Sequence, residues 1–294
     1  MKLSRIAIFF INLSVIFGGI ILIFTSASVG QGVWKTLLEA IGTSLIATGG
    51  VNLLAQFFTE RPKIVGVRMI AVTRNTLDKN IHDRKYSADK IEAVGISLSS
   101  FLHELSNNTK IAERVLFSNT RLRLVFVNPQ SPYLAQRAIE DNMGHDAEKV
   151  LRKKQKQSVE CCIQFYKCLQ ARYQTALDAN PQERPRGIVQ VKLTEFCPYL
   201  AIERYDNDIY WGLYTTDTAG EFAPMFLTNR DDNYLLYDKL KNHFVGLLNK
   251  DFENGSPSKD NFLIKMESGE PWLNRELANN ILGDEVVKNL LGEK

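Results

Sequence analysis

The feature that most constrains this chain is an apolar run near its start, because no charged residue occurs between Ile6 and Trp34. Residues Ile6–Ala27 are almost wholly apolar, and a helix crosses a bilayer with about 20 such residues. The run exceeds the roughly 7–15 apolar residues of a cleaved secretory signal, and a second uncharged stretch, Ala40–Thr59, follows it. The sequence therefore predicts two transmembrane helices, over Ile6–Ala27 and Trp34–Phe58.

Basic residues predict the orientation of this hairpin. Lys2 and Arg5 precede the first expected span, and Arg61 and Lys63 follow the second. The turn between the spans has no Lys or Arg until Lys35. By the positive-inside rule, we expect a bacterial inner-membrane protein with both termini in the cytoplasm.

Small and polar residues recur at helical spacing in both expected spans, and such rows allow helix backbones to approach closely. Glu39 lies one turn into the second span, where an ionisable group usually faces protein or water. The pattern predicts helix association, either within one hairpin or between hairpins. The residues concerned are Asn12, Gly18, Gly19, Glu39, Ala40, Gly42, Ser44, Thr48 and Gly50.

The rest of the chain has the pattern of an α/β domain with a mixed sheet. Apolar strands are expected at Ile91–Ser97, Leu122–Val127 and Ile188–Phe196, with helices between them, and the strand-only stretch Ile188–Thr228 indicates that part of the sheet is antiparallel. We expect a transmembrane hairpin over residues 1–60, a cytoplasmic α/β domain over 61–250, and a polar tail with a short helix over 251–294.

Charge restricts the partners. The 36 basic and 33 acidic residues give a net charge of +3, which argues against a dedicated nucleic-acid-binding surface but is compatible with a local patch.

Polar residues follow two of the expected strands. Ser97 and Ser99 come at the end of the first, and Asn128, Ser131 and Arg137 come after the second. If these strands are neighbours, both loops lie at the edge where open α/β sheets bind ligands. Backbone N–H groups at the helix starts would suit an anion, and Arg137 would suit a phosphate. The alternative is that the serines only cap helices.

Four segments share a pattern with a known family: Ile91–Phe101, Arg121–Ala138, Cys197–Gly212 and Tyr214–Leu248. Together they resemble bacterial phospholipase-D-like domains, over about Ile64–Lys250. The resemblance implies a catalytic His, a Lys two residues later and an Asp five residues further.

Aligning Asp206 with the catalytic Asp of that family puts Tyr199 and Ala201 at the His and Lys positions. Neither side chain can replace the nucleophile or the phosphate-binding cation, so we predict no catalytic residue. The resemblance implies that the retained shape holds a nucleotide-like ligand near Glu195, Arg204 and Asp206. The alternative for Asp206 is a turn residue, since Asp206-Asn207 is expected to close a hairpin of Tyr199–Tyr205 and Asp208–Thr215.

Other signals of chemistry are missing from the sequence. Cys161, Cys162, Cys168 and Cys197 have no CxxC spacing, and there is no P-loop, GxGxxG, GxSxG or HExxH pattern. We therefore predict neither a metal nor a cofactor.

A membrane hairpin joined to a cytosolic sensing domain is similar to membrane effectors of bacterial antiphage systems, including retron-linked and cyclic-nucleotide-triggered ones. The resemblance implies that the α/β domain senses a ligand or partner, and that the spans self-associate and disrupt the inner membrane. The implied partners are the lipid bilayer, further copies of the chain in a homo-oligomer, a nucleotide-like ligand, and a retron or cyclase partner. No direct binding of duplex nucleic acid is expected. The alternatives are a membrane-anchored phospholipase-D-like phosphodiesterase with a divergent site and a non-enzymatic membrane scaffold.

Overall fold

The chain divides into two compact units, Met1–Ile64 and Val65–Lys294. The computed structural model describes residues 5–28, 32, 34–46, 66–71, 79–140, 146–180, 182, 184–196, 198–214, 224–249, 261–267 and 269–293.

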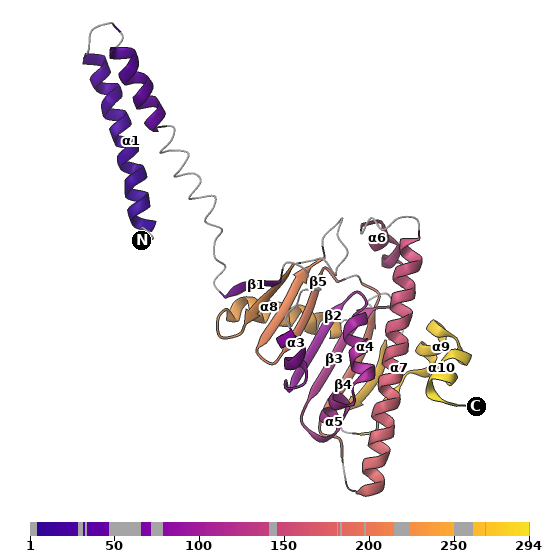
Figure 1. The fold of residues 1–294 in the computed structure, drawn as a ribbon. Helices are drawn as coiled ribbons and strands as arrows, with labels where there is room; N and C mark the ends of the chain where they lie inside the picture. The colour runs from indigo at the N-terminus through magenta and orange to yellow at the C-terminus, as the bar shows by residue number, and fades with distance from the viewer. Residues whose placement is uncertain are drawn as a thin grey trace. The chain divides into compact units, whose positions relative to one another are not determined.

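The N-terminal unit contains helix α1 (Arg5–Ser28) and a second helical stretch, residues 34–46 (Figure 1). Their backbones touch at two glycines. A Cβ atom added to Gly19 would lie 2.6 Å from the carbonyl oxygen of Gly42, and one added to Gly42 would lie 2.8 Å from that of Gly19. The Ser26 hydroxyl donates to Glu39 Oε1 at 3.4 Å. Gly19, Gly42 and Glu39 therefore serve contacts between the two helices of one chain.

The other residues predicted to support helix association differ in their exposure to solvent. Asn12 is buried, Ala40 and Ser44 are exposed, and a Cβ on Gly18 would meet nothing within 4 Å. Thr48 and Gly50 lie outside the described residues.

The expected transmembrane hairpin is wrong by the structure: among the described residues, no helix is both long and apolar enough to cross a bilayer. The same finding contradicts two predictions that depended on the hairpin, namely the inner-membrane location and the bilayer as partner.

The α/β unit is built on a nine-stranded mixed sheet in the order β1-β7-β6-β5-β2-β3-β4-β8-β9. The central strands β2, β3 and β4 are parallel, and every other neighbouring pair is antiparallel. The strands are β1 (Val67–Ala71), β2 (Lys90–Gly95), β3 (Arg121–Val127), β4 (Ile188–Thr194), β5 (Leu200–Tyr205), β6 (Asp208–Leu213), β7 (Met225–Asn229), β8 (Phe262–Glu267) and β9 (Trp272–Leu273).

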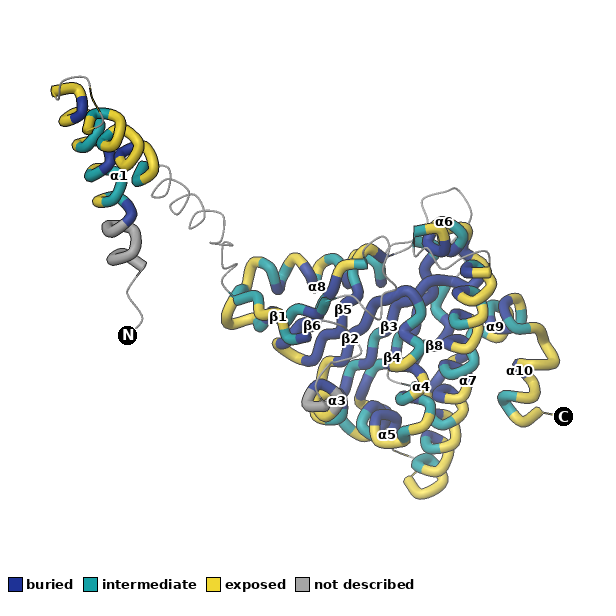
Figure 2. Tube along the Cα trace, turned by 45° about the horizontal axis from the view of Figure 1, so that its top comes forward, coloured by how far each residue is buried: buried dark blue, intermediate teal, exposed yellow. Residues whose placement is uncertain are grey.

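Helices cover the two faces of this sheet unequally. Most lie on one face, where α4, α5 and α7 pack on the largest core cluster (Figures 1 and 2). Helix α8 covers the other face and buries Val94, Val125, Ile202 and Ile209. The helices of this unit are α3 (Lys79–Lys85), α4 (Ser99–Asn107), α5 (Thr109–Phe117), α6 (Tyr133–Glu140), α7 (Ala147–Ala179), α8 (Tyr234–Asn249), α9 (Arg275–Leu282) and α10 (Asp284–Leu291).

The predicted turn at Asp206-Asn207 is confirmed. Tyr205 pairs with Asp208 across a two-residue loop, and Asp206 has a left-handed φ of 53°, which Asp tolerates better than most residues. Its carboxylate accepts hydrogen bonds from the backbone N–H groups of Asp89 and Lys90, at 3.1 and 2.9 Å. Asp206 thus ties the hairpin to the start of β2.

The C-terminal segment contributes to the sheet, although we expected a polar tail. Strand β8 pairs with β4, and β9 pairs with β8. Ala278 of α9 and Val287 of α10 belong to the same core as α7. The short strand β8 has no clear period-two pattern, which is why the sequence did not predict it.

Candidate functional site

The carboxyl ends of β2, β3 and β4 lie at one edge of the sheet, and their loops bring several predicted residues together. Asn128 Nδ2 donates to Glu195 Oε1 at 2.7 Å, and the Ser131 hydroxyl donates to the Glu195 carbonyl at 2.7 Å. The Asn128 N–H also donates to the Thr194 carbonyl at 2.8 Å. These bonds hold the loop after β3 against the loop after β4.

Burial raises the pKa of the Glu195 carboxyl, and the hydrogen bond from Asn128 partly opposes that shift. On the neighbouring loop, the Ser97 hydroxyl donates to Ser99 Oγ at 3.4 Å. Leu98 between them has a left-handed φ of 51°. The same loop cluster therefore contains Ser97, Ser99, Asn128, Ser131 and Glu195.

Arg137 belongs to this edge through an aromatic contact. Its guanidinium lies 5.4 Å from the centre of the Tyr214 ring and forms an ion pair with Glu140 at 3.3 Å. The Tyr214 hydroxyl in turn accepts a hydrogen bond from the Ile96 N–H at 3.1 Å. The hydrogen bonds of the predicted residues at this edge thus run mainly between loops, and they order the edge.

Arg204 and Asp206 do not join this group, because β5 is antiparallel to β2 and ends at the opposite edge. Arg204 instead bonds Glu92 at 2.6 Å and the Asp206 carbonyl at 2.9 Å. Tyr199 precedes β5 and Asp206 follows it, so about 20 Å of extended strand separates them. The three positions aligned with the phospholipase-D motif therefore cannot form one active site.

A second group of side chains was missed by the sequence analysis. Arg123 pairs with Gln190 in the strand register, Gln190 with Lys265, and Lys265 with Trp272. Residues paired in this way share one face of a sheet. With Arg121, two residues before Arg123 on β3, they form a surface that we call the open sheet face. It consists of Arg121, Arg123, Gln190, Lys265 and Trp272.

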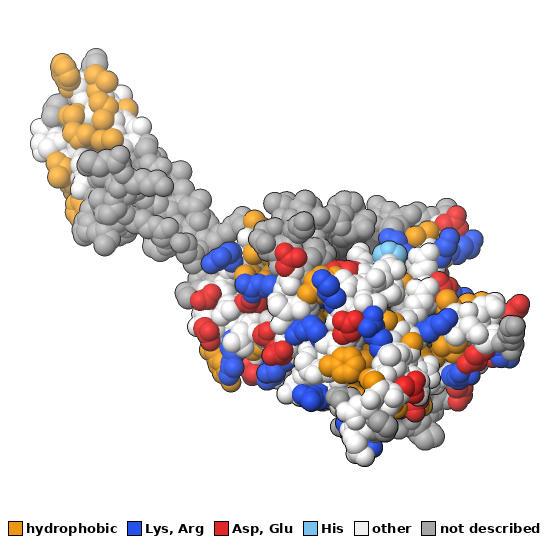
Figure 3. Space-filling view, turned by 60° about the horizontal axis from the view of Figure 1, so that its bottom comes forward, with side chains coloured by type: hydrophobic (Ala, Val, Ile, Leu, Met, Phe, Trp, Pro, Cys, Tyr) orange, Lys and Arg blue, Asp and Glu red, His pale blue; other side chains and the backbone are white. Residues whose placement is uncertain are grey.

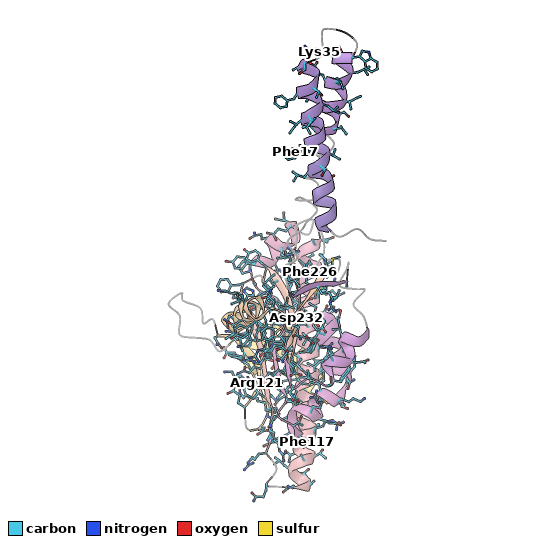
Figure 4. All side chains as sticks on the ribbon, turned by 90° about the vertical axis from the view of Figure 1, so that its left-hand side faces the viewer. Phe17, Lys35, Phe117, Arg121, Phe226 and Asp232 are labelled. Carbon is cyan, nitrogen blue, oxygen red and sulfur yellow. The ribbon has the colours of Figure 1, made fainter. Side chains whose placement is uncertain are left out.

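The open sheet face lies on the α8 side of the sheet, and its Arg123 end reaches α8, since the Arg123 guanidinium lies 5.7 Å from the centre of the Phe244 ring. The core under α8 is formed by strands β2, β3, β5 and β6, with Phe262 of β8 packed against it, whereas Leu273, next to Trp272, packs into the core on the α7 side. Successive strand residues point to opposite faces, so Trp272 lies on the α8 side. Its side chain is 45% exposed. Figure 4 views the sheet from the β1 end, with α8 and α7 on opposite sides of it.

Cations outnumber carboxylates along this face, to which Glu267 adds one exposed carboxylate that accepts a hydrogen bond from Gln190. Buried Glu92 forms ion pairs with both Arg123 and Arg204, which leaves one net positive charge on the three groups. Arg123 Nε is buried and has no hydrogen-bond partner in the described part of the chain. Lys265 Nζ lies 4.2 Å from the centre of the Phe262 ring. On the face of the α/β unit seen in Figure 3, by contrast, basic and acidic side chains are interspersed.

One further cation connects this face to α8. Lys192 follows Gln190 on the same side of β4, and its Nζ donates to the Leu248 carbonyl in the last turn of α8 at 2.7 Å. A cation at a helix C-terminus is stabilising. The signal in the sequence was the alternation of polar with apolar residues in Arg121–Val127 and Ile188–Thr194, which placed cations on one face of each strand.

Comparisons with known proteins add little. No family model matches the chain, and no curated protein matches it. One matching solved structure is titled "Structure of TrmBL2, an archaeal chromatin protein, shows a novel mode of DNA binding". The likeness has a TM-score of 0.30 and 9% identity, and it covers 72% of this chain and 62% of that one. Because the score is so low, it carries no argument about this chain.

These results correct the earlier resemblances. The predicted phospholipase-D-like identity is wrong, since no family model supports it and the strand β5 separates the aligned motif positions. No curated relative supports the resemblance to antiphage effectors or the partners implied with it, including the nucleotide-like ligand and the retron or cyclase. The expectation that duplex nucleic acid is not a partner has no support from these comparisons either.

Proposed function

We propose that this chain is a non-enzymatic sensor whose α/β unit binds an anionic partner on the open sheet face. The observation that carries the proposal is the row of Arg123, Gln190, Lys265 and Trp272, which runs across four strands from the contact of Arg123 with α8 to β9. Strands lie about 4.8 Å apart, so the row extends about 14 Å. Cations held at fixed spacing on strands are ordered before a ligand arrives, which lowers the entropic cost of binding.

A binding role also agrees with the arrangement of the carboxyl edge. A nucleophile needs a neighbouring base that is free to accept its proton. At this edge the Ser131 hydroxyl donates to a backbone carbonyl, and Glu195 accepts from the Asn128 amide. These groups support loop structure, and we assign the recognition of the partner to the open sheet face.

Binding of the purified full chain to fluorescent heparin, a polyanion without bases, tests this proposal. We expect affinity to fall as salt rises, because bound cations are released from the polyanion. The double variant R121Q/K265Q should weaken binding and flatten the dependence on salt. The matched control is K153Q/K156Q, which removes two exposed cations from α7 on the other side of the sheet. Equal losses in the two double variants, or no salt-dependent binding by the wild type, would refute the proposal.

A further inference from the structure

We infer that the anionic partner of the open sheet face is a single-stranded nucleic acid, an inference that rests on the proposed function. The first reason is that this face joins cations to an exposed aromatic ring. Proteins that hold single strands combine positive charge along the backbone with aromatic side chains on which bases stack. Trp272 is 45% exposed at one end of the row, and Arg121 and Arg123 lie at the other.

The second reason is the chemistry between these ends. Gln190 lies between Arg123 and Lys265 in the register, and an amide offers both a donor and an acceptor to the edge of a base. Its Nε2 donates to Glu267 Oε1, which fixes the orientation of the amide and leaves its oxygen as an acceptor. A polyanion without bases would make no use of either the indole or the amide.

The third reason is shape. Duplex DNA is read by a helix or ribbon that enters a groove, whereas a sheet surface suits unpaired bases that lie flat against it. The residues of the open sheet face belong to the neighbouring strands β3, β4, β8 and β9, so they form part of the pleated surface and not a projecting element. We therefore assign this face to a single strand, and we assign Arg121 and Lys265 to its phosphates.

The experiment measures fluorescence anisotropy of the full chain with a labelled single-stranded oligonucleotide of mixed sequence, with the same sequence as a duplex, and with heparin. We expect W272A to weaken single-strand binding roughly 5- to 150-fold, the range that loss of one stacked base implies. W272F should recover much of the affinity because a phenyl ring still stacks, and heparin affinity should not change. The control Y199A removes a tyrosine that is 78% exposed before β5, and it should have no effect.

Salt titration supplies a second readout. Each phosphate contact contributes about 0.7 to the negative slope of log affinity against log salt for a single strand. R121Q/K265Q should therefore reduce that slope by roughly 1.4.

Outcomes separate the two proposals. Unchanged single-strand affinity in W272A, or tighter binding of the duplex than of the single strand, overturns this inference even if heparin still binds in a salt-dependent way. If the wild-type chain binds none of the three probes at low salt, both this inference and the proposed function are overturned.

Discussion

Replacing Glu92 by glutamine removes the central charge of the network under α8. The Glu92 carboxylate is 1% exposed and forms ion pairs with Arg123 and Arg204, whose side chains are 16% and 7% exposed. Glutamine keeps the size of the side chain but leaves two largely buried guanidinium groups without their counter-charge. Removing one partner of a buried pair costs about 3–5 kcal/mol of unfolding free energy.

We expect E92Q to lower the free energy of unfolding by about 3 kcal/mol, at the lower end of that range. Arg204 retains its hydrogen bond to the Asp206 carbonyl at 2.9 Å, and its guanidinium remains 5.5 Å from the centre of the Tyr237 ring. Both contacts partly compensate the Arg204 guanidinium for the loss of its counter-charge. Arg123 lies closer to solvent, so water can reach it more easily than it can reach Arg204.

Urea unfolding of the full chain, followed by circular dichroism, measures this loss as a lower midpoint at an unchanged m-value. The matched control is E267Q, which removes an exposed carboxylate at the end of β8 and should stay within about 0.5 kcal/mol of wild type. A double-mutant cycle of E92Q with R204Q should give a coupling energy above about 1 kcal/mol. If E92Q lowers the free energy of unfolding no more than E267Q does, the network makes no net contribution to stability and the reasoning is wrong.

Three other outcomes are expected. A Cβ added to Gly187 would lie 2.2 Å from a backbone carbonyl oxygen, so G187A should lower the free energy of unfolding by more than about 2 kcal/mol. Gly246 in the interior of α8 has open space around such a Cβ, so G246A should raise the free energy of unfolding by about 0.5–1 kcal/mol, both measured by thermal unfolding. Burial raises the pKa of the Glu195 carboxyl, so this group binds a proton more tightly in the folded protein than in the unfolded chain, and the stability of the protein falls as pH rises through that pKa. Because the Asn128 amide donates to this carboxylate, N128A should raise the pKa of Glu195 further in a carboxyl NMR titration. A lower pKa in N128A would contradict the assigned hydrogen bond. Burial and the hydrogen bond to a glutamate raise the pKa of Tyr86 to about 12, and Y86F should therefore remove one late step from the ultraviolet titration of the tyrosines.

The elements that the sequence predicted well depend on local patterns. The apolar run Leu122–Val127 formed a buried strand, and Asp206-Asn207 formed the turn expected of it, because both signals lie within a few residues. The carboxyl edge could also be anticipated, since Asn128 and Ser131 directly follow a strand. In each case the information is contained in a single short segment.

Contacts between distant segments could not be predicted in this way. Arg204 meets Glu92 only because β5 lies beside β2, and Lys265 meets Trp272 through strands that showed no clear alternation. The hydropathy of Ile6–Ala27 indicated that a helix would bury apolar side chains, but it did not specify whether lipid or protein would surround them. The predicted membrane span was wrong. Strand order and the choice of face depend on the whole set of elements competing for the sheet.

The position of β8 has a consequence for synthesis of the protein. Strand β4 lies between β3 and β8, and β8 begins at Phe262, 68 residues after β4 ends at Thr194. While a ribosome makes this chain, β4 therefore leaves the exit tunnel well before the strand that hydrogen-bonds to its outer side. Exposed backbone groups on an apolar edge strand pair readily with other chains. The interval between these two strands is thus the stage at which the nascent α/β unit would most need a chaperone, and a nonsense mutation before Phe262 would make that exposed edge permanent.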